Sequence, residues 1–247
     1  MTTTEHSGSG DLNRSLELLW DYADRPGRGR KPGLTLDRIV TAAVAVADAD
    51  GLDAVSMRRI ASDLGVGAMS LYRYVPGKAE LLDLMLDQVC AVVPPAEPPS
   101  DWRGAVELIA RRAMDMYLAH PWMLQVDQAR PVLGPNALAG LDLALSWLAD
   151  VAVSDQQKIC LLVTVDGFVS NTARTRVNAQ RAVDRTGVTD EEFWTAQAPI
   201  LEKAMAGGNY PMMAALADNA FSPEGTDLFD FGLGLLLDGL QAFLSRS

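Results

Sequence analysis

The feature that most constrains this chain is a pair of short helical patterns in residues 55–78, separated by a glycine. The patterns cover residues 56–64 and residues 67–74. Gly65 lies between them and suits a turn with positive φ, where a side chain would clash. Ser56 suits the N-cap of the first helix, because its hydroxyl can accept an amide hydrogen bond. Two short helices joined by a glycine turn predict a helix-turn-helix.

The second of these helices has the composition of a contact surface. Leu71 and Val75 lie four residues apart and form the inward stripe. The other side chains then face outward, where hydroxyls and a cation can bind phosphates and base edges, and apolar groups can contact a thymine methyl. A generic α-hairpin with a solvated face is the alternative. The outward residues are Ala68, Met69, Ser70, Tyr72, Arg73 and Tyr74.

Two further helices complete this region. Thr35 suits the N-cap of a helix over residues 35–50, and Gly51 follows its end. Pro76 and Gly77 end the second short helix, and a fourth helical pattern then runs over residues 78–93. That fourth helix continues from the predicted DNA-binding unit toward the rest of the chain, which makes it the expected lever between the two.

The run 34–89 also resembles a known family. Its pieces A-D-A-D-G, S-M-R-R-I-A, L-G-V, S-L-Y-R-Y and P-G-K-A-E-L-L, in this order and spacing, resemble the DNA-binding domain of the TetR (tetracycline repressor) family of bacterial transcriptional regulators. The resemblance covers about a quarter of the chain. It implies an all-α fold, a homodimer and a larger C-terminal domain for ligand binding and dimerisation.

The resemblance also implies which residues face DNA. Arg58 and Arg73 are expected to contact guanines, since a guanidinium can bond O6 and N7 together. Tyr72, Tyr74 and Lys78 are expected to bind phosphates. The chain carries Arg73 and Tyr74 where family members often carry Trp or His. The full implied set is Ser56, Met57, Arg58, Gly67, Ala68, Met69, Ser70, Tyr72, Arg73, Tyr74 and Lys78.

Composition sets the protein class. The chain has 247 residues, of which 49% are apolar, and sustained period-two alternation is scarce, which predicts an all-α protein. No apolar run reaches the ~20 residues that cross a bilayer, and the N-terminus lacks the parts of a signal peptide, so a cytoplasmic location is expected. Cys90 and Cys160 lie in apolar helical patterns and are expected to be buried free thiols.

Charge is distributed unevenly along the chain. The net charge is −11, but residues 1–80 hold 10 Lys and Arg against 11 Asp and Glu, whereas residues 81–247 hold 11 against 21. Local charge matters for phosphate binding, so the total does not exclude DNA. A basic window, RPGRGRKPG, is either an arm that inserts into an A·T-rich minor groove or a solvated linker. Its cations are Arg25, Arg28, Arg30 and Lys31.

Three regions follow from these patterns. Residues 1–33 are expected to be a flexible arm containing a short amphipathic helix at 12–22, residues 34–80 the helix-turn-helix domain, and residues 81–247 the ligand-binding and dimerisation domain. The proline-rich run 94–100 is a loop. Helices are predicted beyond it at 101–119, 122–129, 136–150, 154–185, 190–205, 211–218 and 226–245.

The last predicted helix is apolar almost all round, which requires burial on most sides. We expect it to pack with the long helix 154–185 against a second subunit across a two-fold axis. Gly232, Gly234 and Gly239 would let the backbones approach closely. A helix buried within one subunit is the alternative.

Polar residues recur on one stripe of the long helix. They form either an internal network, such as an Asp166–Arg174 pair, or the polar end of a small-molecule site, because buried polar groups need partners. Thr164 lies beside this stripe. The candidate pocket residues are Met114, Tyr117, Trp122, Trp147, Asp166, Phe168, Ser170, Asn171 and Arg174.

An enzymatic function finds no support in the sequence. The histidines are His6 and His120, and no nucleophile elbow, phosphate loop, dinucleotide fingerprint or zinc spacing occurs, so neither a metal nor another cofactor is expected. The sequence predicts a homodimeric, ligand-responsive regulator, a repressor, with a palindromic operator and a small-molecule effector as partners. The alternatives are a nonspecific or architectural DNA-binding protein and a ligand-binding protein that no longer recognises DNA.

Overall fold

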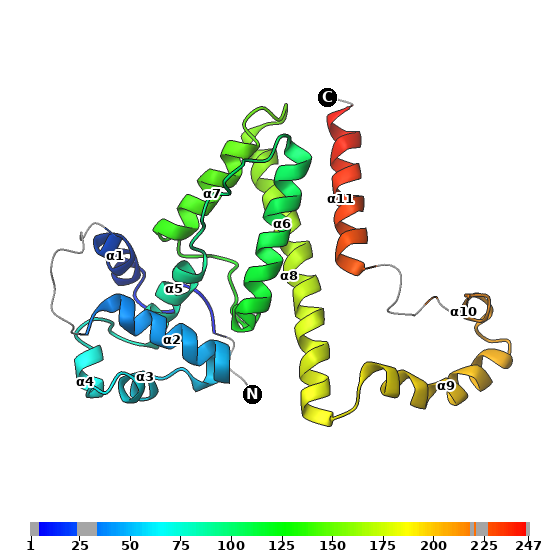
Figure 1. Cartoon of the computed structure of the whole chain (residues 1–247), viewed down its shortest axis with the longest axis horizontal. Coiled ribbons are helices and arrows are strands. Elements are labelled where there is room, and N and C mark those ends of the chain that lie inside the picture. Colours follow the sequence, from blue (N-terminus) through cyan, green and yellow to red (C-terminus); the bar gives the residue numbers. More distant parts are fainter. Residues whose placement is uncertain (1–4, 24–33, 218–219, 221–226, 246–247) are drawn as a thin grey trace. The chain divides into compact units, whose positions relative to one another are not determined.

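The computed structural model describes residues 5–23, 34–217, 220 and 227–245 (Figure 1). Every regular element in these ranges is helical, apart from one isolated bridge between His6 and Asp127, so the all-α prediction is confirmed. No helix within the described ranges has the length and apolar character needed to span a bilayer.

The predicted helix-turn-helix forms, and its ends are set by the predicted residues. The Thr35 and Ser56 hydroxyls cap their helices by accepting backbone N–H groups three residues on. Gly51 and Gly65 have φ values of 85° and 68°, which a side chain would strain. The elements are α2 (Leu36–Asp50), the short 3-10 helix η1 (Leu52–Ala54), α3 (Met57–Asp63), α4 (Ala68–Leu71) and α5 (Lys78–Val89).

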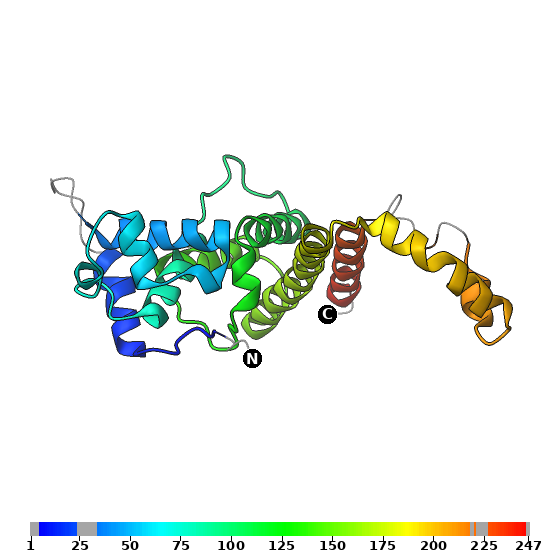
Figure 2. The ribbon, with the colours of Figure 1, turned by 90° about the horizontal axis from the view of Figure 1, so that it is seen from below.

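A continuous apolar core joins these helices. In the structure α2 contacts both α3 and α5, and α3 contacts α4; Figures 1 and 2 show the same grouping. Ile39, Ile60, Leu71, Val75 and Leu81 have no exposed surface. Since α4 is too short to be stable alone, this packing is what holds it in place.

The predicted amphipathic helix at residues 12–22 is α1 (Leu12–Ala23), and it docks on the body of the chain. It contacts α5 and α7 (Pro135–Trp147). Leu19 and Ser15 are buried there. The helix predicted within the arm is therefore confirmed, whereas the disorder expected for residues 1–11 is wrong for residues 5–11.

Residues 5–15, which we call the N-terminal clasp, are tied down by long-range hydrogen bonds. The buried Asp83 carboxylate of α5 accepts the Ser7 Oγ–H at 3.0 Å, the Gly8 N–H at 2.9 Å and the Ser15 Oγ–H at 2.7 Å. The composition of residues 5–11 predicted disorder because their partner lies about 70 residues away in sequence. The stability of this segment comes from that partner.

The remaining helices of the first part differ from prediction mainly at their ends. Helix α5 ends at Val89 instead of residue 93, because Cys90 already leaves the helix. The helix predicted at 122–129 is a short 3-10 helix, η2 (Pro121–Gln125), after which Val126 is extended. Helices α6 (Trp102–Ala119) and α8 (Asp155–Thr186) match their predicted ranges closely, and α7 ends at Trp147 instead of residue 150.

Helix α7 is capped by a side chain from α5. The Asp87 carboxylate accepts the N–H groups of Asn136 at 3.3 Å and Ala137 at 2.9 Å, and the Asn136 Nδ2–H at 3.1 Å. A Cβ added at Gly134 would collide with this carboxylate. A glycine at this position therefore lets α5 and the start of α7 approach each other.

Contacts divide the chain into two compact units, residues up to 170 and residues 171–246. The boundary expected between residues 80 and 81 lies inside the first unit, where α5 contacts α1, α2 and α7. The second unit holds the end of α8 together with α9 (Asp190–Ala206), α10 (Pro211–Ala214) and α11 (Leu228–Leu244). Helix α10 is half the predicted length.

Only one stripe of α11 is buried within the single chain. Phe229, Leu233 and Leu237 are buried, at four-residue spacing. The Asp227 carboxylate caps the helix and pairs with Arg176 of α8 at 2.7 Å. The opposite side remains exposed, with Leu228, Phe231, Leu235 and Phe243.

Replacing Asp87 by Ala should destabilise the fold, because the first amides of α7 lose their acceptor. We expect the free energy of unfolding to fall by ~1–3 kcal/mol, measured by urea denaturation followed by circular dichroism. Asp142→Ala is the matched control, because it removes a carboxylate from an exposed position of α7. It should change the free energy of unfolding little. Equal effects of the two substitutions would contradict the capping role of Asp87.

Candidate functional site

The turn of α4 presents a mixed polar and apolar surface, as the sequence predicted. Leu71 and Val75 are fully buried, so the intervening side chains must point away from the core. Met69 is 76% exposed and Tyr72 is 46% exposed, and Arg73 is exposed beside them. The helix itself ends at Leu71, and residues 72–74 continue it as a turn.

The structure changes the role of two residues in the implied DNA-facing set. Met57 is only 7% exposed because it lies on the inner face of α3 with Ile60 and Ala61. The Tyr74 hydroxyl donates its proton to the Leu34 carbonyl at 2.8 Å. The Tyr74 proton is thus already donated within the chain, and a phosphate would have to replace the Leu34 carbonyl as its acceptor.

The arginines of α3 and of the turn after α4 differ in whether their guanidinium groups are already paired within the chain. Arg59 pairs with Asp50 at 3.0 Å and with Asp63 at 2.9 Å. The hydrogen bond to Asp63 raises the pKa of Arg59 further above its usual value, so it stays cationic. Arg58 and Arg73 are exposed and make no hydrogen bond or ion pair within the described ranges. Among the described residues of this surface, they are the guanidinium groups that remain available to bind DNA.

The remaining members of the set occupy the ends of the helices. Ser56 is exposed, and its Oγ accepts the Arg59 N–H at 3.2 Å while its own hydroxyl proton stays available. The Lys78 Nζ lies 3.0 Å from Glu5 Oε1 and donates to the Leu52 carbonyl at 3.3 Å. Gly67 is exposed, and Ala68 and Ser70 are partly exposed. The arm residues Arg25, Arg28, Arg30 and Lys31 lie outside the described residues.

Two of the predicted pocket residues meet between α6 and α8. The Tyr117 hydroxyl donates to Asp166 Oδ1 at 2.9 Å. Desolvation raises the pKa of Asp166 above its usual value, and the Tyr117 hydrogen bond partly opposes that shift. Burial, with the nearby charges of Asp87 and Asp166, raises the pKa of the Cys90 thiol to about 11. Asp166 is exposed on one side in the single chain, so its carboxyl is shielded only where it meets the buried Tyr117, and Met114 is buried on the same helix as Tyr117.

Other predicted pocket residues are placed elsewhere. The buried Trp122 donates its indole Nε1–H to Asp48 Oδ1 at 2.8 Å, and His120 Nδ1 lies 2.8 Å from the same oxygen. These contacts join α2 to η2, so Trp122 connects the helix-turn-helix to the rest of the first unit. Asn171 and Arg174 are exposed in the second unit. Trp147 and Phe168 are half-buried.

Several polar side chains of α8 bond to their own helix. Ser170 Oγ donates to the Gly167 carbonyl at 3.2 Å, and Thr164 Oγ1 donates to the Cys160 carbonyl at 2.7 Å. Such local bonds satisfy hydroxyls without a ligand. Both cysteines are free as expected, but Cys160 is exposed in the single chain.

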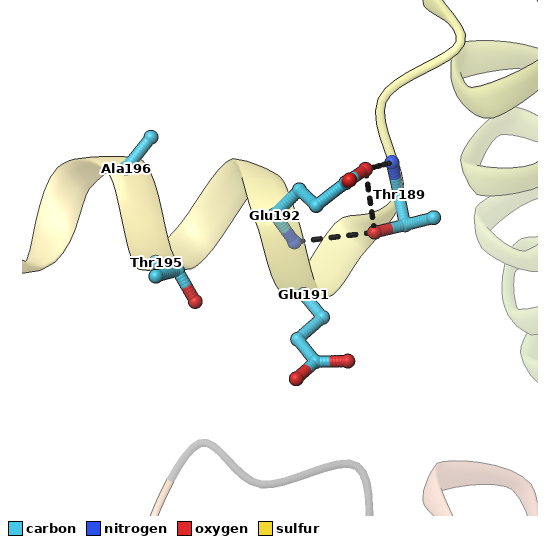
Figure 3. A pocket seen from close by; sticks show the side chains of 5 residues that line it. All are labelled: Thr189, Glu191, Glu192, Thr195 and Ala196. Atoms are coloured by element: carbon cyan, nitrogen blue, oxygen red, sulfur yellow. Dashed lines mark hydrogen bonds between the residues drawn. The ribbon is translucent and has the colours of Figure 1, made fainter.

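Two hollows occur away from the predicted pocket. One, of about 540 Å³, lies at the start of α9 (Figure 3). It is wide open, and its Thr189 and Glu192 satisfy each other in a capping box, in which the Thr189 backbone N–H bond lowers the pKa of Glu192. The other, of about 370 Å³, is lined by α1, α2, α5 and α7, including Leu19, Val40 and Asp87. Neither contains a predicted pocket residue.

Fold and surface together define the class: an all-α helix-turn-helix protein with a separate helical region. Residues 39–85 match the model of the bacterial regulatory proteins of the tetR family, and residues 94–244 match the tetracyclin repressor-like C-terminal domain. The chain belongs to the TetR family, as the motifs indicated. It is a helix-turn-helix transcriptional regulator of the repressor class, and the family consists of DNA-binding regulators that are not enzymes.

Known relatives agree with this assignment. The HTH-type transcriptional repressor DrrR1 of Streptomyces coeruleorubidus is 51% identical over 99% of this chain and 91% of its own length. The crystal structure of apo ActR from Streptomyces coelicolor has a TM-score of 0.69 at 30% identity, covering 88% of this chain and 99% of that one. ActR in complex with actinorhodin has a TM-score of 0.66 at 31% identity, covering 86% and 97%.

Replacing Tyr117 by Phe should raise the pKa of Asp166 further, because the carboxylate loses the hydrogen bond that lowers it. The measurement is a carbon-13 NMR titration of the Asp166 carboxyl. Tyr72→Phe, at an exposed residue of the turn that follows α4, is the control and should leave this pKa unchanged. A lowered pKa in the Tyr117 variant would contradict the assigned direction of the bond.

The same shift predicts a pH dependence of stability. Since folding raises the pKa of Asp166 above 3.8, the folded state favours the neutral acid. The stabilising contribution is therefore complete below pH 3.8 and is lost as the pH rises through the folded-state pKa. Asp166→Asn should remove this part of the pH dependence in denaturation curves; an unchanged profile would contradict the shift.

Proposed function

We propose that the chain is a ligand-responsive repressor that binds a palindromic operator as a homodimer. The observation that carries this proposal is the outward display of Met69, Tyr72 and Arg73 around two fully buried anchors, Leu71 and Val75. A helix turn held this rigidly can enter a major groove with its side chains already oriented. A repressor of this kind acts on DNA in the cytoplasm.

Base reading is assigned to the two free guanidinium groups. Arg58 and Arg73 suit bidentate bonds to guanine O6 and N7. Ala68 and Met69 suit contact with a thymine methyl, and Gly67 allows the backbone to approach DNA closely, since nothing lies within 4 Å of a Cβ built there. Ser56, Ser70, Tyr72 and Lys78 then bind phosphates and fix the register.

The basic residues that precede α2 are assigned to the DNA backbone or the minor groove. Arg25, Arg28, Arg30 and Lys31 lie in one seven-residue window without an acidic residue. Arginines of this kind favour a narrow, A·T-rich minor groove, where the negative potential is strongest. They would add affinity on sites with A·T-rich flanks.

The exposed apolar side of α11 supports dimerisation. Leu228, Phe231 and Leu235 are each more than half exposed in the single chain, which is costly in water. Gly234 and Gly239 have open space where a Cβ would stand, so another backbone can approach. Isologous packing of α8 and α11 from two subunits would bury these groups. It would set two recognition surfaces about 34–36 Å apart, or a multiple of that distance, on the operator.

The effector is proposed to bind between α6 and α8. The Asp166 carboxylate, which keeps an exposed side in the single chain, and the Tyr117 hydroxyl provide polar groups next to the buried Met114, and the half-buried Trp147 and Phe168 provide aromatic surface. An apolar site with a few polar groups is the usual form of a small-molecule pocket. The ligand-bound structure of ActR supports a small-molecule effector for this chain.

Regulation is proposed to occur by population shift. Helix α5 contacts both the helix-turn-helix and α7, and Trp122 bonds to Asp48 of α2. A ligand that favours the arrangement with wrongly spaced recognition helices would weaken operator binding by the ratio of its affinities for the two arrangements.

Arg73→Ala should weaken specific binding by ~1–3 kcal/mol and relax the preference at one base position, because a bidentate base contact is lost. The measurement is fluorescence anisotropy on an operator selected from random duplexes, compared with a scrambled duplex. Arg14→Ala on α1 removes the same charge from an exposed position and is the control. Equal losses on the operator and on the scrambled duplex would refute base reading by Arg73.

Leu235→Asp should dissociate the dimer, since it places a charge at the centre of the proposed apolar interface. Sedimentation velocity at micromolar concentration should show the variant as a monomer and the unmodified chain as a dimer. Val93→Asp, at an exposed loop position, is the control and should remain dimeric. A dimeric Leu235 variant would place the interface elsewhere.

A further inference from the structure

Helix α5 carries three buried carboxylates on one side. Glu80, Asp83 and Asp87 lie at spacings of three and four residues and are 7%, 1% and 5% exposed. A buried carboxylate is costly unless hydrogen bonds compensate it. All three accept backbone N–H groups: Asp87 caps α7, and Glu80 and Asp83 both hold the N-terminal clasp.

The clasp is shaped to fit these carboxylates. Glu80 Oε1 accepts the N–H of Asp11, the residue just before α1, at 3.0 Å. A Cβ added at Gly10 would collide with the Glu80 carboxylate. The Asp83 carboxylate accepts hydrogen bonds from Ser7, Gly8 and Ser15. Small and hydroxylated residues, which in the sequence suggest disorder, are therefore the ones that this site requires.

The other side of the clasp binds the loop that leads into α7. The Ser7 N–H donates to the Asp127 carbonyl at 3.1 Å, and the Asp127 N–H donates to the Glu5 carbonyl at 2.9 Å. The Val132 N–H donates to Ser7 Oγ at 3.1 Å. Ser7 thus bonds to α5 and to residues 127–132 at the same time.

The clasp also reaches the DNA-binding surface. The Glu5 carboxylate lies 3.0 Å from the Lys78 ammonium, and each side chain of this pair is 31% exposed. Lys78 is the first residue of α5 and is the proposed phosphate contact at this end of the surface. A phosphate and Glu5 compete for the same cation, and an uncompensated Glu5 would repel the DNA backbone.

We propose that the N-terminal clasp is an autoinhibitory element in which Glu5 competes with the DNA backbone for Lys78, and that Ser7 links this competition to residues 127–132. The inference rests on the proposed DNA-binding function. DNA binding must separate Glu5 from Lys78, which loosens the clasp. By linkage, any change that loosens the clasp from the loop strengthens DNA binding.

Glu5→Gln tests the competition directly. The probe is a mixed-sequence duplex of roughly 30 base pairs, because a phosphate contact needs no operator. We expect the dissociation constant at low salt to fall about two- to five-fold, the size of one partly exposed ion pair. The slope of log K against log salt should steepen by up to ~0.9, as one more counterion is released without compensating uptake at Glu5.

Glu17→Gln is the matched control, because it removes the same charge from an exposed position that pairs with Arg14. Its dissociation constant should stay unchanged. Equal effects of the Glu5 and Glu17 substitutions would overturn the inference, since the gain would then follow net charge alone. Introducing Glu5→Gln into a Lys78→Met background should abolish the gain; a gain that persists there would equally overturn it.

Ser7→Ala tests the link to the loop without a change of charge. It removes the hydrogen bonds of the Ser7 hydroxyl to Asp83 and Val132. The dissociation constant for DNA should therefore fall, as in the Glu5 variant. Unchanged binding would contradict the link through Ser7. If Lys78→Met leaves binding unchanged while Arg73→Ala weakens it, the clasp inference fails and the proposed DNA-reading function stands.

Discussion

The structure depends on helix α5 being buried on nearly all sides. Every residue from Glu80 to Asp87 is buried, and this run includes three carboxylates as well as Leu81 and Met85. Apolar side chains can be buried by any neighbouring surface, but carboxylates need donors at defined positions. The requirement for donors therefore selects which segments pack against α5, namely the N-terminal clasp and the start of α7.

The same burial makes the DNA-facing surface rigid. Helix α4 has four residues and cannot persist in isolation. Leu71 and Val75 anchor it in a core shared with α2 and α5, so the orientations of Tyr72 and Arg73 are set by packing. Since α5 also contacts α7, the proposed effector would act on DNA by moving α5, and with it the proposed reading surface, against α7.

Local signals in the sequence predicted much of this arrangement. Caps, glycine turns and period-3.6 patterns act within one helical turn, so Ser56, Gly65 and the ends of most helices could be read directly. Contacts between residues that are distant in sequence could not be predicted in this way. Met57 was expected on the DNA side, Trp122 in a ligand pocket and Tyr74 on a phosphate, yet each has its place decided by tertiary packing or by a contact with a distant segment.

The sequence by itself determined the all-α class, the helix-turn-helix and its anchors, because these rest on periodicity and on backbone conformations accessible to only a few residue types. Only the tertiary structure decided that Asp50 and Asp63 hold Arg59, whereas Arg58 and Arg73 bond to no described residue, and which of the described polar residues are structural. It also converted a polar, glycine-rich segment into a clasp. The physical reason is that a hydrogen bond or an ion pair is specified by two positions at once, and a linear pattern shows only one of them.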